Sequence, residues 1–220
     1  MREPSFQQLL ILGLLLVGLL IFIQLGIFTL ALEKLGLSSH SIFLVLMTSL
    51  FGSAINLPLF TIQGNPLIKL DRPPAHGLLL GRPLPYTGKT IIAINMGGAL
   101  IPILVSIYLI RLHQISFPVF LSAIFIVSGI CYTFSRPIPG LGIGMPVFIA
   151  PISAALTAIL LAPEQSASLA YVCGTIGVLI GADLLRLNNI RDLGAPVAAI
   201  GGAGTFDGIF ITGIVAVLLA

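Results

Sequence analysis

Charged residues are scarce in this sequence. Only 8% of its 220 residues are Asp, Glu, Lys or Arg, against about 25% in an average soluble domain. Hydrophobic residues make up 57% of the chain, and its mean hydropathy is +1.15. So few charged side chains do not suffice to cover a globular surface in water. This excludes an ordinary soluble domain and predicts a polytopic membrane protein surrounded by lipid.

Basic clusters and metal-binding motifs are also missing. The net charge of +3 is spread along the chain, which excludes a nucleic-acid partner. The two cysteines, Cys131 and Cys173, both lie in apolar runs. This placement is typical of small buried side chains and not of a disulfide or a metal site. We therefore expect neither a metal nor a cofactor.

Several catalytic groups have no candidates in the sequence. The histidines His40, His76 and His113 lie at the ends of apolar runs or between them, where a Ser–His pair inside a membrane does not form. Ser128-Gly129 lacks the preceding glycine pattern of a membrane serine protease, and no HExxH motif is present. No glycine-rich phosphate loop follows a strand pattern. These absences leave the acidic residues as candidates.

Seven apolar runs approach the length of about 20 residues that a helix needs to cross a bilayer. The first, Leu9–Leu32, is too long for the core of a signal peptide and lacks a small-residue cleavage pattern, so we expect it to be retained. The sequence predicts an all-α protein, a polytopic transmembrane helix bundle that forms a single domain over residues 1–220. The predicted spans are 8–32, 41–60, 91–111, 116–134, 145–162, 168–186 and 196–220.

The basic residues are distributed unevenly over the two sides of this bundle. With a cytoplasmic N-terminus, only two of the ten Lys and Arg residues, Lys34 and Arg111, fall outside. This bias follows the positive-inside rule and predicts that the N-terminus is cytoplasmic and the C-terminus lies outside. The eight residues on the cytoplasmic side are Arg2, Lys69, Arg72, Arg82, Lys89, Arg136, Arg186 and Arg191.

The longest predicted excursion from the membrane is the segment 61–89. It contains five prolines, which excludes a single helix. Its beginning, TIQGNPLIKL, alternates weakly between apolar and polar residues around a Gly-Asn-Pro turn. This pattern predicts a short cytoplasmic hairpin, and a solvated linker is the alternative.

Polar residues recur inside the predicted spans. Ser53 and Asn56 are three residues apart, on one face of a helix, and Asn95 is followed by Gly97 and Gly98. Such residues commonly make hydrogen bonds and close contacts between membrane helices. They indicate which helix faces point into the bundle.

Two aspartates, Asp183 and Asp207, lie in Gly-rich apolar spans on either side of a short polar turn. A carboxylate inside a membrane is costly and usually marks a functional site. A helix that began at Pro196 would separate the two carboxylates by about 10 Å in depth. The glycines of 201–204 instead favour an extended approach, with the helix beginning near Thr205 as its N-cap. Asp207 would then lie in the first turn, where the helix dipole favours a negative charge.

Two carboxylates that meet do not both ionise easily, and they share a proton. One then activates a water molecule and the other protonates the leaving amine, as in aspartic proteases. We therefore hypothesise that Asp183 and Asp207 are catalytic and hydrolyse peptide bonds of membrane-protein or peptide substrates. The residues expected to contact the substrate are Asn95, Gly202, Gly204 and Thr205.

The pattern GADLLRL…GAGTFDGIF, residues 181–187 and 202–210, resembles an uncharacterised family of bacterial and archaeal membrane proteins, a domain of unknown function. It is also remotely similar to the GxGD intramembrane aspartyl proteases: presenilins, signal peptide peptidases and prepilin peptidases. In presenilin-type members two aspartates lie on consecutive helices joined on the cytoplasmic side, and Asp183 and Asp207 match that placement. The resemblance implies an integral protein of the prokaryotic plasma membrane with GxGD-like endopeptidase activity.

The sequence departs from the protease pattern in three respects. Two residues separate Gly204 from Asp207, where the GxGD motif has none. Ala182 replaces the aromatic residue that precedes the first aspartate in that group. No Pro-Ala-Leu motif follows the last predicted span.

Three alternatives are open for the acidic pair. In a structural role, Asp183 would pair with Arg186 at helical spacing, and Asp207 would pair with Asn95 or Asn56. A proton- or cation-coupled transporter would use an acidic residue on a broken, Gly-rich helix. A non-catalytic membrane scaffold would leave the two aspartates facing different neighbours.

Overall fold

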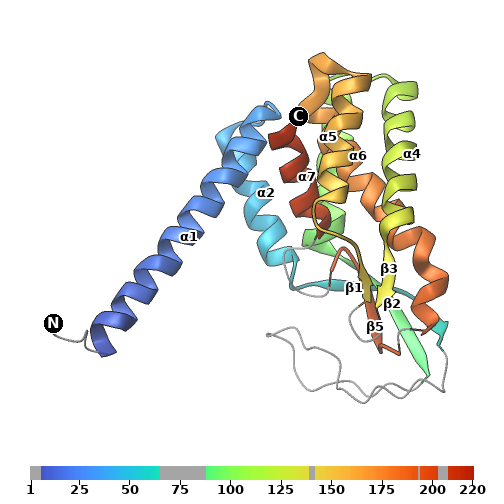
Figure 1. Ribbon diagram of the computed structural model, residues 1–220, viewed down its shortest axis with the longest axis horizontal. Coiled ribbons are helices and arrows are strands. Elements are labelled where there is room, and N and C mark those ends of the chain that lie inside the picture. The colour runs from blue at the N-terminus through green and yellow to red at the C-terminus, as the bar shows by residue number, and fades with distance from the viewer. Residues whose placement is uncertain (1–5, 65–87, 139–141, 193, 203–207) are drawn as a thin grey trace.

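A group of helices and a small β-sheet across one end of them make up the molecule (Figure 1). The computed structural model describes residues 6–64, 88–138, 142–192, 194–202 and 208–220. The α-helices are α1 (Phe6–Lys34), α2 (Ser39–Gly52), α3 (Ile101–Leu112), α4 (Phe117–Phe134), α5 (Ile149–Leu161), α6 (Ser166–Val178) and α7 (Gly208–Leu219).

Four further helical segments extend these helices or lead into them. The π-helical segment η1 (Met96–Leu100) leads into α3, and the 3-10 turn η2 (Pro163–Gln165) leads into α6. At its other end α6 continues as the π-helical η3 (Leu179–Asp183) and the 3-10 segment η4 (Leu184–Asp192). The continuous helical segment formed by α6, η3 and η4, residues 166–192, is called the α6 rod below. Its helical winding therefore changes twice as it approaches the sheet.

The sheet has the strand order β1-β2-β5, with strands β1 (Asn56–Gln63), β2 (Lys89–Asn95) and β5 (Val197–Ile200). β1 and β2 are antiparallel and pair Asn56 with Asn95, whereas β2 and β5 are parallel and pair Ile94 with Ile200. A separate hairpin joins β3 (Arg136–Ile138) to β4 (Gly142–Gly144). The parallel pair β2–β5 brings the chain just before α3 beside the chain that leads to α7.

The strands correct the all-α prediction, because three predicted spans are helical over only part of their length. In the span 41–60 the helix ends at Gly52 and β1 follows. Pro58 disfavours a helix there and is tolerated because β1 is an edge strand. The spans 91–111 and 196–220 each begin as a strand. In the first of them the run of β-branched isoleucines at 91, 92 and 94 favours the extended form.

The predicted late start of the last helix agrees with the structure in part, since β5 occupies Val197–Ile200, a turn at Gly201 and Gly202 follows, and the described residues of α7 begin at Gly208. The predicted N-cap Thr205 and Asp207 in the first helical turn lie outside the described residues. The predicted hairpin over 61–89 has a different outcome. The residues 61–63 pair with 89–91 of β2, so this arm belongs to a hairpin wider than the Gly-Asn-Pro turn. Residues 65–87 lie outside the described part of the chain.

Helix length supports fewer membrane crossings than the seven predicted. Among the described residues, two helical segments are long and apolar enough to cross a bilayer, Phe117–Phe134 and Pro163–Arg191. Four other apolar helices, including α5 and α7, are shorter. The two long segments differ in surroundings: 22% of the apolar window is buried in the first and 72% in the second.

α6 is the centre of the helix group, and Ser168–Thr175 is buried without interruption. Small residues let its neighbours approach closely. A Cβ atom on Gly177 would lie 2.7 Å from Val127 Cγ1 of α4, and one on Gly181 would lie 2.9 Å from Cys131 Cβ. Glycine at these two positions therefore lets α4 pack directly against the backbone of the α6 rod.

Candidate functional site

Asp183 is the last residue of η3, where the α6 rod passes from π-helical to 3-10 winding. Its side chain is partly buried at the sheet end of the helices. π-helical segments are rare and occur frequently at functional sites. The local change of winding rotates Asp183 relative to the side chains that precede it on α6.

A glycine turn faces this carboxylate. The Gly201 N–H donates a hydrogen bond to Asp183 Oδ2, with 3.4 Å between nitrogen and oxygen. Gly201 follows β5 directly, and Gly201 and Gly202 have φ angles of +82° and +89°. Only glycine adopts these values without strain. The end of β5 therefore directs a backbone donor at Asp183, and a turn that requires glycine begins at this donor.

The same turn rests on the beginning of the α3 helix. A Cβ atom on Gly201 would lie 2.8 Å from Ala99 N and 2.9 Å from Gly98 C, so the two backbones touch. Gly98 and Ala99 belong to η1, the second π-helical segment of the structure. Gly201 is thus held between the two π-helical segments, with η1 on one side and Asp183 of η3 on the other.

Asn95 fixes the geometry of η1. It is fully buried and ends β2, and its Oδ1 accepts a hydrogen bond of 2.7 Å from Gly98 N. Its Nδ2 donates to Ser53 O at 2.7 Å and to Asn56 Oδ1 at 3.0 Å. Asn95 therefore joins the end of α2, the start of β1 and the first turn of η1.

α6 and α7 run antiparallel, and glycines on both helices show which levels meet. A Cβ atom on Gly174 would lie 3.6 Å from Thr212 Cγ2 and 3.5 Å from Ala216 Cβ. One on Gly213 would lie 2.8 Å from Thr175 Oγ1. Gly174 is therefore level with a point midway between Thr212 and Ala216.

This register fixes the height at which α7 begins. Because the two helices are antiparallel, a step of six residues forward along α6 from Gly174 corresponds to a step of six residues back along α7 from position 214. Gly208, the first residue of α7, therefore lies level with about Ile180 of η3. Asp183 is three residues further along the rod, or about 5 Å for helical geometry. α7 therefore begins close to the height of the Asp183 carboxylate and not on the far side of the sheet.

The predicted site residues fall into two groups. Asp183, Gly202 and Asn95 are described: Asp183 accepts the hydrogen bond from the Gly201 N–H, and Gly202 is the next residue after the donor. Asn95 contacts the site only through η1, and its predicted contact with a substrate stays a prediction. The remaining predicted residues, Asp207, Gly204 and Thr205, lie outside the described residues.

The backbone part of the site was not predicted from the sequence. Gly201 and its contacts with the two π-helical segments were missed, because π-helical winding leaves no residue pattern. The consecutive glycines after VAAI were the one available signal. Among the described residues, no group of three His, Cys, Asp or Glu side chains is arranged to hold a metal ion.

The sequence profile of one protein family matches residues 50–219, and the family is described as "Protein of unknown function (DUF1614)". The chain belongs to this DUF1614 family. The matched region contains the sheet, η1, η3, Gly201 and α7, so every element of the site described above lies within it. Neither the curated proteins nor the solved structures contain a match to the chain.

Arg186, the predicted structural partner of Asp183, is engaged with the end of α4. Its Nη2 donates to Tyr132 O at 2.6 Å and to Ser135 O at 2.9 Å, and its Nε donates to Ser135 Oγ at 3.2 Å. The guanidinium also lies 4.1 Å from the centre of the Tyr132 ring, a cation–π contact. Arg186 therefore ties the α6 rod to the carbonyl groups that end α4.

Arg186→Gln removes a charged donor from two carbonyl groups and the contact with the Tyr132 ring. Charge-assisted hydrogen bonds of this kind contribute about 1–2 kcal/mol, so we expect the midpoint of thermal unfolding in detergent to fall by about 3–6 °C. The matched control is Arg191→Gln, which changes an exposed side chain of the same η4 segment. Equal midpoints for the two variants would contradict the assigned role of Arg186.

Proposed function

We propose that the chain is an integral membrane aspartic endopeptidase in which Asp183 and Asp207 form the catalytic pair. One observation carries the proposal: the Gly201 N–H donates to Asp183, six residues before Asp207 in the chain. The first residue of the glycine-rich segment, Gly201, is thereby anchored at Asp183. The remote resemblance to GxGD proteases adds to the proposal.

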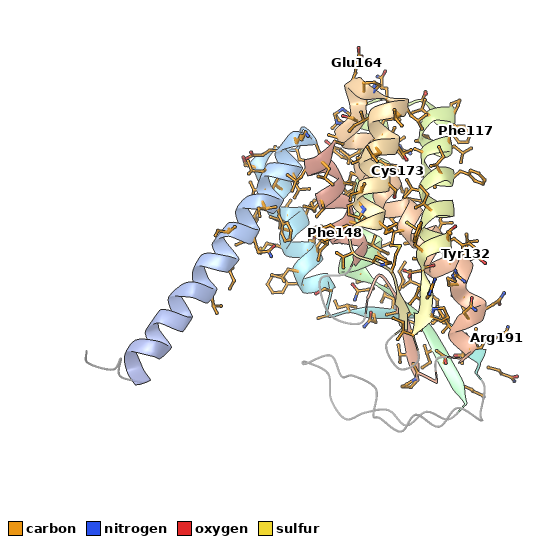
Figure 2. The ribbon with its side chains drawn as sticks, in the orientation of Figure 1. Phe117, Tyr132, Phe148, Glu164, Cys173 and Arg191 are labelled. Atoms are coloured by element: carbon orange, nitrogen blue, oxygen red, sulfur yellow. The ribbon has the colours of Figure 1, made fainter. Side chains whose placement is uncertain are left out.

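The surface of the helices supports a location in the membrane. Large apolar side chains are exposed on several helices, such as Phe51 of α2 (71%), Phe125 of α4 (80%) and Leu160 of α5 (79%). In water these side chains would be unfavourable, whereas in lipid they need no protein partner. Charged residues lie at the two ends, with Glu164 at one and Arg191 at the other (Figure 2).

The path of the chain also supports a bundle that crosses the membrane repeatedly. Figure 1 shows α4, α5, α6 and α7 running between the same two ends, with consecutive helices pointing in opposite directions, whereas α1 slants away from this group. The helices α5 and α7 have 13 and 12 residues, or about 20 Å of helix against a hydrocarbon core of about 30 Å. In our proposal β5 and the glycine turn complete the crossing of α7.

The height of α7 supports a meeting of the two carboxylates. Gly208, the first described residue of α7, lies at the level of η3. The predicted mismatch of about 10 Å assumed a helix from Pro196, and β5 replaces that helix. The offset along the rod between Gly208 and Asp183 is about 5 Å, which two side chains can bridge.

The proposed chemistry follows from this arrangement. Two neighbouring carboxyl groups share one proton. The ionised group removes a proton from a water molecule that attacks the scissile carbonyl, and the protonated group donates to the leaving nitrogen. The Gly201 N–H would stabilise negative charge on Asp183 during this cycle. Gly202, Gly204 and Thr205 would line the approach of an extended, membrane-embedded peptide.

Asp183→Asn and Asp207→Asn each test the catalytic pair. We expect either substitution to lower the cleavage of transmembrane peptides in proteoliposomes by at least about 10³-fold, because an amide does not take the proton from water. Asp192→Asn, in the same connection between α6 and α7, is the matched control and should retain cleavage. Retained cleavage in either variant of the pair would contradict the proposal.

Labelling of single cysteines tests the membrane topology. The native Cys131 and Cys173 are buried, so they contribute little background. We expect a membrane-impermeant maleimide to label Glu164→Cys on intact cells and to label Arg191→Cys only after the cells are opened, since the sheet end is cytoplasmic in the proposed orientation. Labelling of both variants on intact cells would contradict this topology.

A second candidate function, proton- or cation-coupled transport, is favoured by one observation. The hydroxyl groups of Tyr171 and Thr175 are completely buried on α6, and among the described residues the only hydrogen-bonding partner each has is the other. Such hydroxyls, on the same rod as Asp183, would suit an internal polar path. Asp183-dependent ion uptake by proteoliposomes that cleave no peptide would establish transport in place of proteolysis.

A further inference from the structure

We infer that Asn95 is a positioning residue that holds the Gly201 N–H against Asp183. The catalytic meaning of this inference rests on the proposed function, but the structural coupling does not. Asn95 lies on β2 and touches neither Asp183 nor Gly201 through any hydrogen bond of the described structure. Its influence is transmitted through the backbone of η1.

The Asn95 amide is locked in one orientation. Both N–H groups are used, one on Ser53 O and one on Asn56 Oδ1, while Oδ1 accepts from Gly98 N. The side chain is 0% exposed, so water does not replace a lost partner. A buried amide with three partners therefore dictates where the backbone of Gly98 lies.

Gly98 and the following Ala99 form the surface on which Gly201 rests, at hypothetical Cβ distances of 2.9 Å and 2.8 Å to their backbone atoms. The other constraint on Gly201 is the pairing of Ile200 with Ile94. Asn95 connects the two segments that constrain Gly201, because it directly follows Ile94 of β2 and directly precedes η1. A change at Asn95 consequently acts on Gly201 from two directions.

The hydrogen bond at the end of this chain of contacts is sensitive to small movements. Its donor–acceptor distance of 3.4 Å is at the long end for an N–H···O bond. A shift of a few tenths of an ångström at Gly201 breaks or strengthens it. Loss of Asn95 should therefore appear at Gly201 before it appears in the rest of the sheet.

Hydrogen exchange at the Gly201 amide, resolved to single residues by mass spectrometry, measures this coupling without any substrate. Asp183→Ala removes the acceptor and sets the upper limit of the exchange rate. We expect Asn95→Leu to raise the Gly201 rate by at least about tenfold, towards that limit. Asn95→Asp keeps an acceptor for Gly98 N but no donor for Ser53 O, so we expect an intermediate rate. Asn56→Ala, which removes one partner only, should change the rate least.

The outcomes separate a positioning role of Asn95 from a general folding role. A positioning role raises exchange at Gly201 while the β1–β2 amides remain protected. A general folding role raises exchange over β1, β2 and β5 together, and this result would overturn the inference. Unchanged Gly201 exchange in both folded Asn95 variants would also overturn it. If Asn95→Leu fails to fold, Asn95→Asp decides between these results.

Kinetics then connect the inference to the proposed function. In a cleaving enzyme the Asn95 variants should lower kcat at unchanged KM, whereas a rise in KM alone would assign Asn95 to substrate contact. If no peptide is cleaved but Gly201 exchange follows Asn95, the proposed protease function fails and the positioning role stands. If peptides are cleaved but Gly201 exchange does not follow Asn95, the positioning role fails and the protease function stands.

Discussion

The contact between Gly201 and Asp183 is the constraint on which the site depends. Gly201 directly follows β5 of the three-stranded sheet, and Asp183 is the last residue of the π-helical segment η3 that continues α6. A partly buried carboxylate needs hydrogen-bond donors, and here a backbone N–H supplies one. The end of β5 at Ile200 directs this donor at Asp183, and two glycines with positive φ turn the chain immediately after it.

Changes of helical winding provide the space for this contact. η1 and η3 both depart from α-helical geometry next to Gly201, and both are followed by regular or 3-10 helix. The glycines at 177 and 181 let α4 approach the same rod closely, and Arg186 fastens the next turn to the end of α4. Asp183 thus lies between two attachments of the α6 rod to α4: the close contacts at Gly177 and Gly181 before it and the hydrogen bonds of Arg186 after it.

The sequence predicted the continuous helices well and the strands poorly. The run 116–134 is uninterrupted and apolar, and the structure has a helix over Phe117–Phe134. LPLF and IIAI are also apolar, and hydrophobicity alone does not separate a buried strand from a helix over so few residues. Pairing with each other determines that both segments are strands, since LPLF lies in β1 and IIAI lies beside it in β2.

The candidate site was predictable only in part. A carboxylate in an apolar run marked Asp183 as a candidate. The glycines of 201–204 predicted a late start of the last helix, and the structure agrees in part, since β5 precedes α7 and the described residues of α7 begin at Gly208. The donor to Asp183 was not predictable, because it comes from the backbone and depends on a parallel strand pair between residues more than a hundred positions apart. Asp207 lies outside the described residues, and its role stays a prediction.

The separation of the Asp183 and Asp207 carboxyl groups in an experimentally determined structure of the protein in lipid tests the central claim most directly. The account predicts that the nearest oxygens lie within about 7 Å of each other, either in contact or bridged by one water molecule. A separation beyond about 12 Å, with side chains between the two groups, would contradict the account.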